Sequence, residues 1–348
     1  MKASDLMIKC LEEEGVTRIF GVPGEENADF MMSLKKSKKI KFILCRHEQA
    51  AAFMADTFGR LTGKAGVCLS TLGPGVTNLM TGLADANMDR APVVAIIGQG
   101  STKRLHKESH QIMDSISMVQ PISKWAQTIL TPENISEVVR KAFKVAETEK
   151  PGLTVIELPE DIAEQEIDEN PIKPILTRRP AADNRAIEEA LNLIIDSKNP
   201  IILAGNGTIR KRASNRLRVL VENLGIGVIN TFMAKGSVSY KDKHSLFTIG
   251  LGSGDYNNLA IDESDLVIAI GYDLVEYSPS AWNRIEGGEK KIIHIDFSPA
   301  EIDKDYLPNV EVIGDLAGAL YQLNKALIER ISKKDLPLFK IESRQKLR

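Results

Sequence analysis

The strongest constraint on the fold is a continuous apolar run at residues 92–98, PVVAIIG. A short run without polar alternation is typical of a strand that is buried on both faces of a parallel sheet. Other expected strands alternate with helical segments along the first half of the chain, at 18–22, 41–46, 66–71 and 153–158. This alternation predicts an α/β fold with a doubly wound parallel sheet.

A second alternation follows a stretch that is acidic and then punctuated by proline. Residues 166–183 contain Pro171, Pro174 and Pro180, which predicts an extended linker. Beyond it we expect strands at 200–204, 227–231, 266–270 and 291–295, and helices at about 184–197, 213–224 and 315–330. A chain of 348 residues is long enough for two cores. We therefore expect a first domain at 1–165, a linker at 166–183, a central Rossmann-like domain at 184–330 and a connector at 331–348.

The composition is that of a soluble globular protein, with 43% hydrophobic and 26% charged residues. A formal net charge of −2 argues against a nucleic-acid or membrane partner. No apolar stretch approaches the ~20 residues that span a bilayer. Cys10, Cys45 and Cys68 lack metal-ligand spacing, so we interpret them as core residues in a reducing compartment and expect a cytoplasmic protein.

Glu48 is expected at the edge of the sheet where open α/β folds bind their ligands. The run FILCRHEQ at 42–49 predicts a buried strand that leads into a helix, with Glu48 at the carboxyl edge of the sheet. Turns rich in glycine and proline follow three other strands, at 21–25 (GVPGE), 73–75 (GPG) and 98–100 (GQG). Such turns let backbone approach a ligand closely, so we expect a pocket around Glu48.

The second half contains two glycine-rich turns where a nucleotide could lie, at 205–207 and 250–254. Neither has the G-x-G-x-x-G spacing of a dinucleotide site. The two turns alone still leave a nucleotide-binding protein, of the sirtuin or electron-transfer-flavoprotein kind, as an alternative. It predicts tight binding of a dinucleotide.

The motifs of the first half resemble the pyrimidine-binding domain of thiamine-diphosphate enzymes of the acetolactate synthase family. The segments that carry the resemblance are GVPGE, RHEQAAAFMADTFGRLTGKAG, STLGPGVTN, GLADA and PVVAIIGQ, in this order. HQIMDSISMVQPISKW at 110–125 and IGYDLVEYSPSAWN at 270–283 are most similar to the catabolic, flavin-independent members. The resemblance implies a homo-dimer or tetramer with active sites between protomers.

The resemblance also assigns roles to residues. Glu48 matches the catalytic glutamate, which hydrogen-bonds the aminopyrimidine ring of thiamine diphosphate and promotes loss of the thiazolium proton. The reaction it implies is decarboxylation of a 2-oxo acid, such as pyruvate, and ligation of the two-carbon unit to a second 2-oxo acid. Gln111 and His110 would approach the substrate. The residues expected to line the cofactor are Val22, Pro23, Gly24, Glu25, Thr71, Gly73, Pro74, Gly75 and Asn78.

The chain departs from the family pattern in three respects. It has no GDG motif, which in the family belongs to a third domain that holds the diphosphate through Mg²⁺, so we expect no metal ligand here and an inactive isolated chain. Acidic residues in 272–276 replace an arginine-containing segment, which makes bound FAD unlikely. The pair Glu25 and Glu26 would repel a carboxylate substrate, which leaves open an acyl-CoA decarboxylase, another 2-oxo acid decarboxylase or a non-catalytic assembly module.

Overall fold

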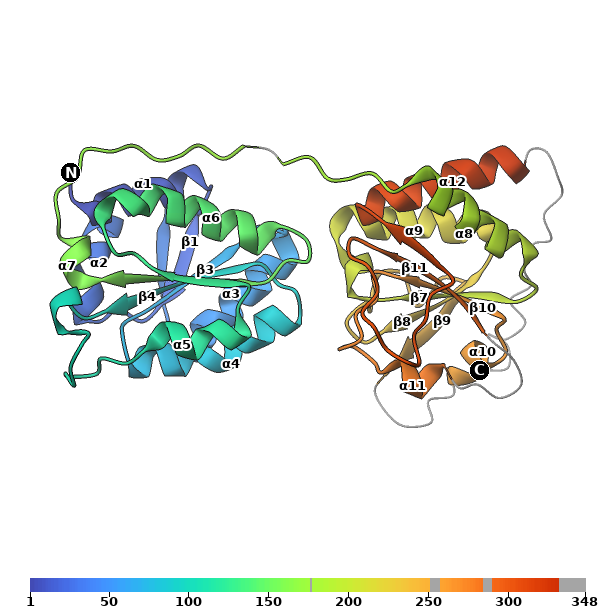
Figure 1. Ribbon diagram of the computed structural model, residues 1–348, viewed down its shortest axis with the longest axis horizontal. Helices are drawn as coiled ribbons and strands as arrows, with labels where there is room; N and C mark the ends of the chain where they lie inside the picture. Colours follow the sequence, from blue (N-terminus) through green and yellow to red (C-terminus); the bar gives the residue numbers. More distant parts are fainter. Residues whose placement is uncertain (176, 251–256, 284–289, 332–348) are drawn as a thin grey trace. The chain divides into compact units, whose positions relative to one another are not determined.

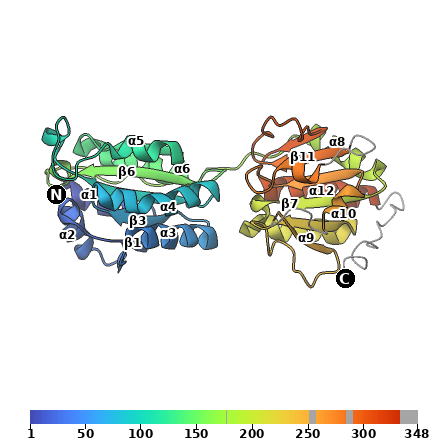
Figure 2. The same cartoon turned by 90° about the horizontal axis from the view of Figure 1, so that it is seen from below.

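The computed structural model describes residues 1–175, 177–250, 257–283 and 290–331. The chain divides into two compact units, Met1–Leu176 and Thr177–Arg348. Each unit is a six-stranded parallel sheet with helices on both faces, the doubly wound α/β architecture predicted from the sequence (Figure 1; Figure 2). Most of the glycine-rich turn at 250–254 and nearly all of the expected connector at 331–348 lie outside the described residues.

The first sheet has the strand order β2-β1-β3-β4-β6-β5. Its strands are β1 (Arg18–Gly21), β2 (Lys41–Leu44), β3 (Gly66–Ser70), β4 (Val93–Gln99), β5 (Trp125–Thr128) and β6 (Leu153–Pro159). Every residue of β3, β4 and β6 is buried, so the apolar run at 92–98 is a central strand as predicted. The order reverses between β1 and β3, because the chain builds β2 on one side of β1 and then returns to the other.

Helices cover this sheet on both faces (Figure 1). On one face lie α1 (Ala3–Glu13), α2 (Ala28–Lys36) and α6 (Ile135–Glu147), and on the other α3 (Glu48–Thr62), α4 (Pro74–Met88) and α5 (Ser115–Val119). The short α7 (Glu160–Ala163) follows β6 directly. Each face therefore has its own apolar core, and the polar loops gather at the two edges of the sheet.

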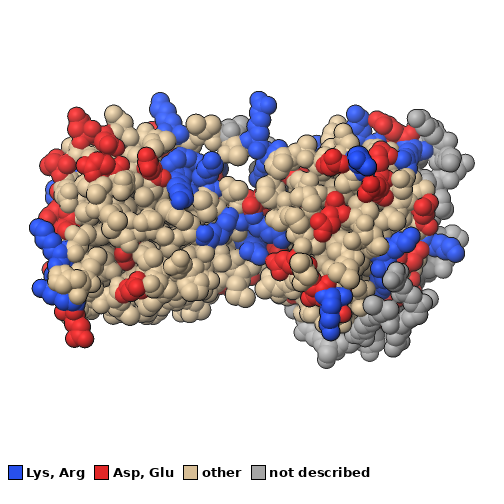
Figure 3. Space-filling model, in the orientation of Figure 1, with Lys and Arg blue, Asp and Glu red and all other residues tan. Residues whose placement is uncertain are grey.

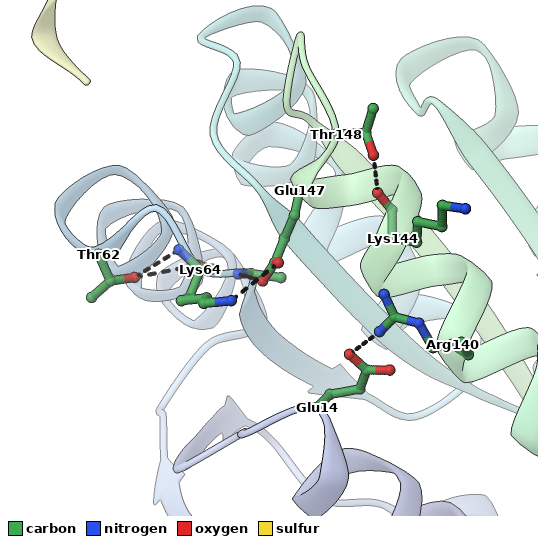
Figure 4. Close-up of polar contacts among 8 residues, drawn as sticks. Glu14, Thr62, Lys64, Arg140, Lys144, Glu147 and Thr148 are labelled. Atoms are coloured by element: carbon green, nitrogen blue, oxygen red, sulfur yellow. Dashed lines mark hydrogen bonds and ion pairs between the residues drawn. The ribbon is translucent and has the colours of Figure 1, made fainter. Parts of the chain in front are cut away.

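Charged side chains tie the covering helices to one another and to the sheet (Figure 4). The Glu147 carboxylate at the end of α6 accepts hydrogen bonds from the Ala65 backbone N–H at 3.0 Å and from Lys64 Nζ at 3.5 Å, just before β3. Arg140, also on α6, pairs with Glu14 after α1. Burial raises the pKa of Glu14, although the hydrogen bond from Arg140 lowers it. These contacts hold α6 against the strands that carry the site.

The prediction of a buried strand before Glu48 is wrong in one respect. β2 is an edge strand that pairs only with β1, and its side chains are largely solvent-accessible. Phe42 and Ile43 are half-buried, whereas Leu44 is 69% exposed. The apolar character of this run identifies a strand but not its place in the sheet.

The second sheet has the order β12-β11-β10-β7-β8-β9. Its strands are β7 (Pro200–Ala204), β8 (Gly227–Thr231), β9 (Ser245–Ile249), β10 (Leu266–Ile270), β11 (Lys291–Asp296) and β12 (Val310–Ile313). One face carries α8 (Asn184–Asp196), α9 (Lys211–Leu224) and α12 (Leu316–Ile331), and the other α10 (Asn258–Asp262) and α11 (Pro279–Trp282). The order reverses between β7 and β10, so this unit has its own topological switch point.

The three cysteines are buried free thiols, as predicted, and burial raises the pKa of Cys68 to about 12.

Within the described ranges, no helix combines the length and the apolar character needed to cross a membrane.

Candidate active site

The loops that carry the predicted site residues meet at the switch point of the first sheet. β1 ends at Gly21 and leads into the turn 22–25, and β3 ends at Ser70 and leads into the turn 71–75. These two strands are neighbours at the position where the strand order reverses. Open parallel sheets leave a crevice at this point, outside the carboxyl ends of the strands, where ligands bind.

Glu48 is the first residue of α3, next to this crevice. His47 precedes it as the N-cap, and its Nδ1 accepts a hydrogen bond from the Gln49 backbone N–H at 3.1 Å. The first turn of a helix favours a negative charge, which stabilises a carboxylate at this position. The Glu48 side chain is buried, with the residue only 8% exposed.

Asn78 on α4 holds the Glu48 carboxylate in place. Its Nδ2 donates a hydrogen bond to Glu48 Oε2 at 3.0 Å. Among the described residues, this is the one hydrogen bond made by the Glu48 carboxylate, so Oε1 is left to accept a bond from a ligand. From the sequence, Asn78 could be either a surface amide or a site residue. The structure places its side chain against Glu48.

The glycines of the two turns allow close approach to Glu48 and Thr71. A Cβ atom added at Gly75 would lie 3.6 Å from Glu48 Oε1 and 3.1 Å from Thr71 Cγ2. At Gly24 an added Cβ would lie only 2.5 Å from the Thr71 Cβ, a distance that excludes any other residue. The turns therefore bring backbone and small side chains together beside the buried carboxylate.

Two buried polar atoms at this end of the unit have no hydrogen-bond partner among the described residues, Ser70 Oγ and Asn27 Nδ2. Ser70 is fully buried, and its Cβ would lie 3.3 Å from a Cβ added at Gly75. Buried polar groups in native proteins are nearly always paired with protein, ligand or water. Ser70 Oγ is thus a polar group beside the Gly75 turn that a ligand or a bound water can satisfy.

Other predicted residues lie farther from the carboxylate or face solvent. Glu25, His110 and Gln111 are exposed, and none of them is hydrogen-bonded to Glu48 within the described part of the chain. The Gln111 backbone lies against the Gly73 turn, since a Cβ added at Gly73 would lie 2.4 Å from the Gln111 carbonyl oxygen. Val22 is half-buried, and Pro23 and Pro74 are exposed.

Glu26 belongs to the site although sequence reasoning did not select it. Its Oε2 accepts a hydrogen bond from Thr71 Oγ1 at 2.9 Å, which joins the turn after β1 to the turn after β3. The sequence feature that could have identified Glu26 was its position directly after Glu25. Two adjacent glutamates, however, do not show which side chain faces the sheet. Because Glu26 is engaged with Thr71 and Glu25 is exposed, the acidic pair does not present both charges to a ligand.

Close packing of α3 against α4 sets the distance between Glu48 and Asn78. A Cβ added at Gly82 on α4 would lie 2.6 Å from the Ala52 Cβ on α3. Farther along the helices, Arg60 on α3 pairs with Asp85 at 3.2 Å and with Asp89. The small residues let the helices touch near the site, and the charged residues join them at the far end.

In the second unit a carboxylate fills the corresponding crevice. Glu276 is 3% exposed and accepts hydrogen bonds from the backbone N–H groups of Asn206, at 2.9 Å, and Asp273, at 2.9 Å, and from the Thr231 hydroxyl. Burial raises the pKa of Glu276 to about 7, against the hydrogen bonds, which lower it. The glycine turn at 205–207 thus binds a side chain of this chain.

An aromatic cluster occupies the same end of the second sheet. The Tyr272 ring packs edge-on against Trp282, with 5.9 Å between centroids, and tilted against Tyr306, at 5.6 Å. Trp282 Nε1 donates a hydrogen bond to the Tyr272 hydroxyl at 3.1 Å, and His294 Nδ1 lies 2.9 Å from the Tyr306 hydroxyl. All four side chains are buried, so they form core rather than a ligand pocket.

Within the described residues, no group of three or more His, Cys, Asp or Glu side chains is arranged to hold a metal ion.

Comparison with known families places both units. Residues 1–118 match the thiamine pyrophosphate enzyme family's N-terminal TPP binding domain, and residues 187–323 match its central domain. The chain is 40% identical to a probable acetolactate synthase large subunit of Methanocaldococcus jannaschii, over 100% of this chain and 60% of that protein.

Two bacterial relatives have similar coverage. An acetolactate synthase of Bacillus subtilis is 36% identical over 92% of this chain and 56% of its own length. A catabolic acetolactate synthase of Raoultella terrigena is 36% identical over 94% of this chain and 58% of its own length. The chain therefore spans between half and two thirds of these relatives.

The α3–α4 contact generates a prediction about stability. Replacement of Gly82 by Ala should force the helices apart and lower the free energy of unfolding by about 1–3 kcal/mol. Gly318→Ala on α12 is the matched control, because its Cβ would meet no atom closer than 3.5 Å. That change should be neutral or stabilising by up to about 1 kcal/mol. Calorimetric unfolding of both variants tests this, and equal stability would contradict the packing argument.

The buried carboxylate of the second unit generates a prediction about pH. Its pKa rises from 4.5 to about 7 on folding, so the folded chain binds the proton more tightly than the unfolded chain. The free energy of unfolding should therefore decrease as pH rises from about 4.5 to about 7, by up to roughly 3 kcal/mol. Glu276→Gln should flatten this dependence. Exposed Glu222 provides the control, Glu222→Gln, and identical pH profiles of the two variants in denaturant titrations would contradict the prediction.

Proposed function

Because this chain belongs to the thiamine pyrophosphate enzymes, with their N-terminal and central domains, we propose that it supplies the pyrimidine-binding half of an acetolactate synthase-like active site. The reaction is decarboxylation of a 2-oxo acid, pyruvate, and ligation of the two-carbon unit to a second 2-oxo acid. The observation that carries this proposal is the buried Glu48 carboxylate, held through one oxygen by Asn78 at the switch point of the first sheet.

The residues of the crevice fit the pyrimidine end of thiamine diphosphate. Gly75 leaves space beside Glu48 Oε1 that a Cβ would fill, and Ser70 Oγ is a buried polar atom in need of a partner. Thiamine diphosphate, when bound, supplies the carbon nucleophile that adds to the 2-oxo acid and stabilises the charge left when carbon dioxide departs. Glu48 holds a proton between its carboxylate and a ring nitrogen of the pyrimidine, and Asn78 orients that carboxylate.

The domain organisation follows the same proposal. Residues 1–165 form the pyrimidine-binding domain, 166–183 the linker and 184–330 the central domain, in keeping with the two compact units and the matched ranges. The diphosphate and Mg²⁺ are held by a further domain, in keeping with the relatives' greater length.

Replacement of Glu48 tests the proposed role. The isolated chain, given thiamine diphosphate, Mg²⁺ and pyruvate, should form no acetolactate. A chimera of this chain with the remaining C-terminal part of the Methanocaldococcus jannaschii relative should form it. Glu48→Gln in the chimera should lower kcat by a factor of about 10²–10⁴, because the pyrimidine ring nitrogen loses the carboxyl group with which it exchanges a proton.

Glu13→Gln, on the exposed side of α1, is the control and should leave kcat unchanged. Full activity of the Glu48→Gln chimera would exclude the mechanism. A folded but inactive chimera that binds no thiamine diphosphate would favour the non-catalytic assembly module.

We further propose that the central domain binds no flavin. Dinucleotides bind open α/β sheets at the switch point, through the backbone of the first glycine turn. Here the Asn206 N–H donates to Glu276, and the aromatic side chains of Tyr272, Trp282 and Tyr306 fill the adjoining space. A flavin phosphate would have to displace a buried carboxylate.

The absorbance spectrum of the purified chain tests this second proposal. We expect no flavin bands, also after incubation with excess FAD and gel filtration. Glu276→Ala should not create binding either, because the aromatic cluster remains. A stoichiometric flavin spectrum in the unaltered chain would contradict the proposal.

The oligomeric state belongs to the same proposal. We propose a homo-dimer or tetramer in the cytoplasm, and sedimentation of the purified protein measures the oligomeric state.

A further inference from the structure

The segment between β4 and α5, residues 100–114, lies at the same edge of the first sheet as Glu48. It contains the short 3₁₀ helix Thr102–Arg104 and carries His110 and Gln111. Most of its side chains are exposed, so an apolar core does not hold it. Its position must therefore depend on polar contacts.

This segment contacts the Gly73–Gly75 turn, which borders the candidate site. Gln111 has a positive φ of 57°, and its carbonyl oxygen faces Gly73, itself at φ 52°. A Cβ at Gly73 would lie 2.4 Å from that oxygen, so the two backbones are in direct contact. Any shift of the segment would change the space above the Gly73–Gly75 turn, next to Glu48.

Two adjacent carboxylates from α7 hold the beginning of the segment. Glu160 Oε1 accepts hydrogen bonds from the Ser101 N–H at 3.0 Å and from Arg104 Nη2 at 2.7 Å. Asp161 accepts from the Thr102 N–H at 2.9 Å and from the Thr102 hydroxyl at 2.6 Å. Hydrogen bonds to ionised acceptors are about twice as strong as neutral ones, so two successive backbone N–H groups are firmly anchored.

A third carboxylate, from the end of β6, holds both ends of the segment through Gln99. Glu157 is 4% exposed and accepts hydrogen bonds from Gln99 Nε2 at 3.0 Å and Thr128 Oγ1 at 2.7 Å. Gln99 Nε2 also donates to the Met113 carbonyl at 2.9 Å, while its Oε1 accepts from the Gly100 N–H at 3.0 Å. One buried amide, oriented by Glu157, thus ties residue 100 to residue 113.

We propose that Glu157, Glu160 and Asp161 are positioning residues that clamp the segment 100–114 over the sheet edge and so place Gln111 against the Gly73 turn. The clamp itself is a property of this chain, whereas its effect on substrate rests on the function proposed above. None of the three carboxylates needs to touch substrate or cofactor. They act through the backbone of the segment and through Gln99.

Hydrogen exchange and trypsin cleavage of the chain test the clamp directly. The segment contains Lys103, Arg104 and Lys107 as cleavage sites, and Lys103 and Lys107 are exposed. Asp161→Ala and Glu160→Ala should each raise the cleavage rate and the amide exchange of residues 100–112 by at least about tenfold, because each change removes two hydrogen bonds to an ionised acceptor. Glu164→Ala, an exposed carboxylate directly after α7, should change neither.

Conservative variants separate positioning from a general loss of stability. Asp161→Asn keeps an acceptor for the Thr102 N–H, and Glu157→Gln keeps one for Gln99. Both variants should therefore retain nearly normal amide exchange in the segment. Unaltered cleavage and exchange in all the alanine variants would overturn the proposal. Exchange that rises equally throughout the first unit would overturn it too, since the carboxylates would then only stabilise the fold.

Kinetics in the active chimera report the effect on substrate. Asp161→Ala should raise KM for pyruvate by about tenfold through misplacement of the segment, with an unchanged affinity for thiamine diphosphate. An unchanged KM with a loosened segment would overturn the link to Gln111. An inactive parent chimera with a confirmed clamp would instead refute the proposed function and leave the clamp intact.

Discussion

The reversal of strand order between β1 and β3 is the constraint on which the candidate site depends. Parallel strands with helices on both faces leave their loops no room except at the edges of the sheet. At the reversal, the connections from β1 and β3 run to opposite sides, which opens a crevice between the two turns. The two turns, the first turn of α3 and the first turns of α4 all meet there, and their chemistry follows from that placement.

Three buried carboxylates show how environment gives one residue type different roles. Glu48 has one hydrogen-bond donor among the described residues and lies beside Gly75, which has no side chain, so its other oxygen can accept a bond from a ligand. Glu276 is surrounded by donors of its own chain and closes a crevice that could otherwise hold a phosphate. Glu157 is saturated by Gln99 and Thr128 and acts on the backbone of a neighbouring segment.

Central strands were predictable from the sequence, and three of the four edge strands were not. The predicted strands β3, β4 and β6 are buried along their whole length, and their largely apolar sequences are visible without any structure. The strands that the sequence did not indicate, β5, β9 and β12, all lie at sheet edges. An edge strand buries less of each side chain, so it needs no continuous apolar run. β2 is the reverse case, since it has such a run and is still an edge strand.

The fold class, the order of the central strands and their helices, the glycine turns and the presence of a carboxylate at a sheet edge could all be inferred from the sequence. These features depend on local backbone preference and on periodicity, which neighbouring residues along the chain express. Three pairings became visible only in the folded chain: Asn78 with Glu48, Glu26 rather than Glu25 with Thr71, and Glu157, Glu160 and Asp161 with a segment more than forty residues earlier. Such pairings depend on which strands become neighbours and on how closely helices approach, and these are properties of packing across the whole unit.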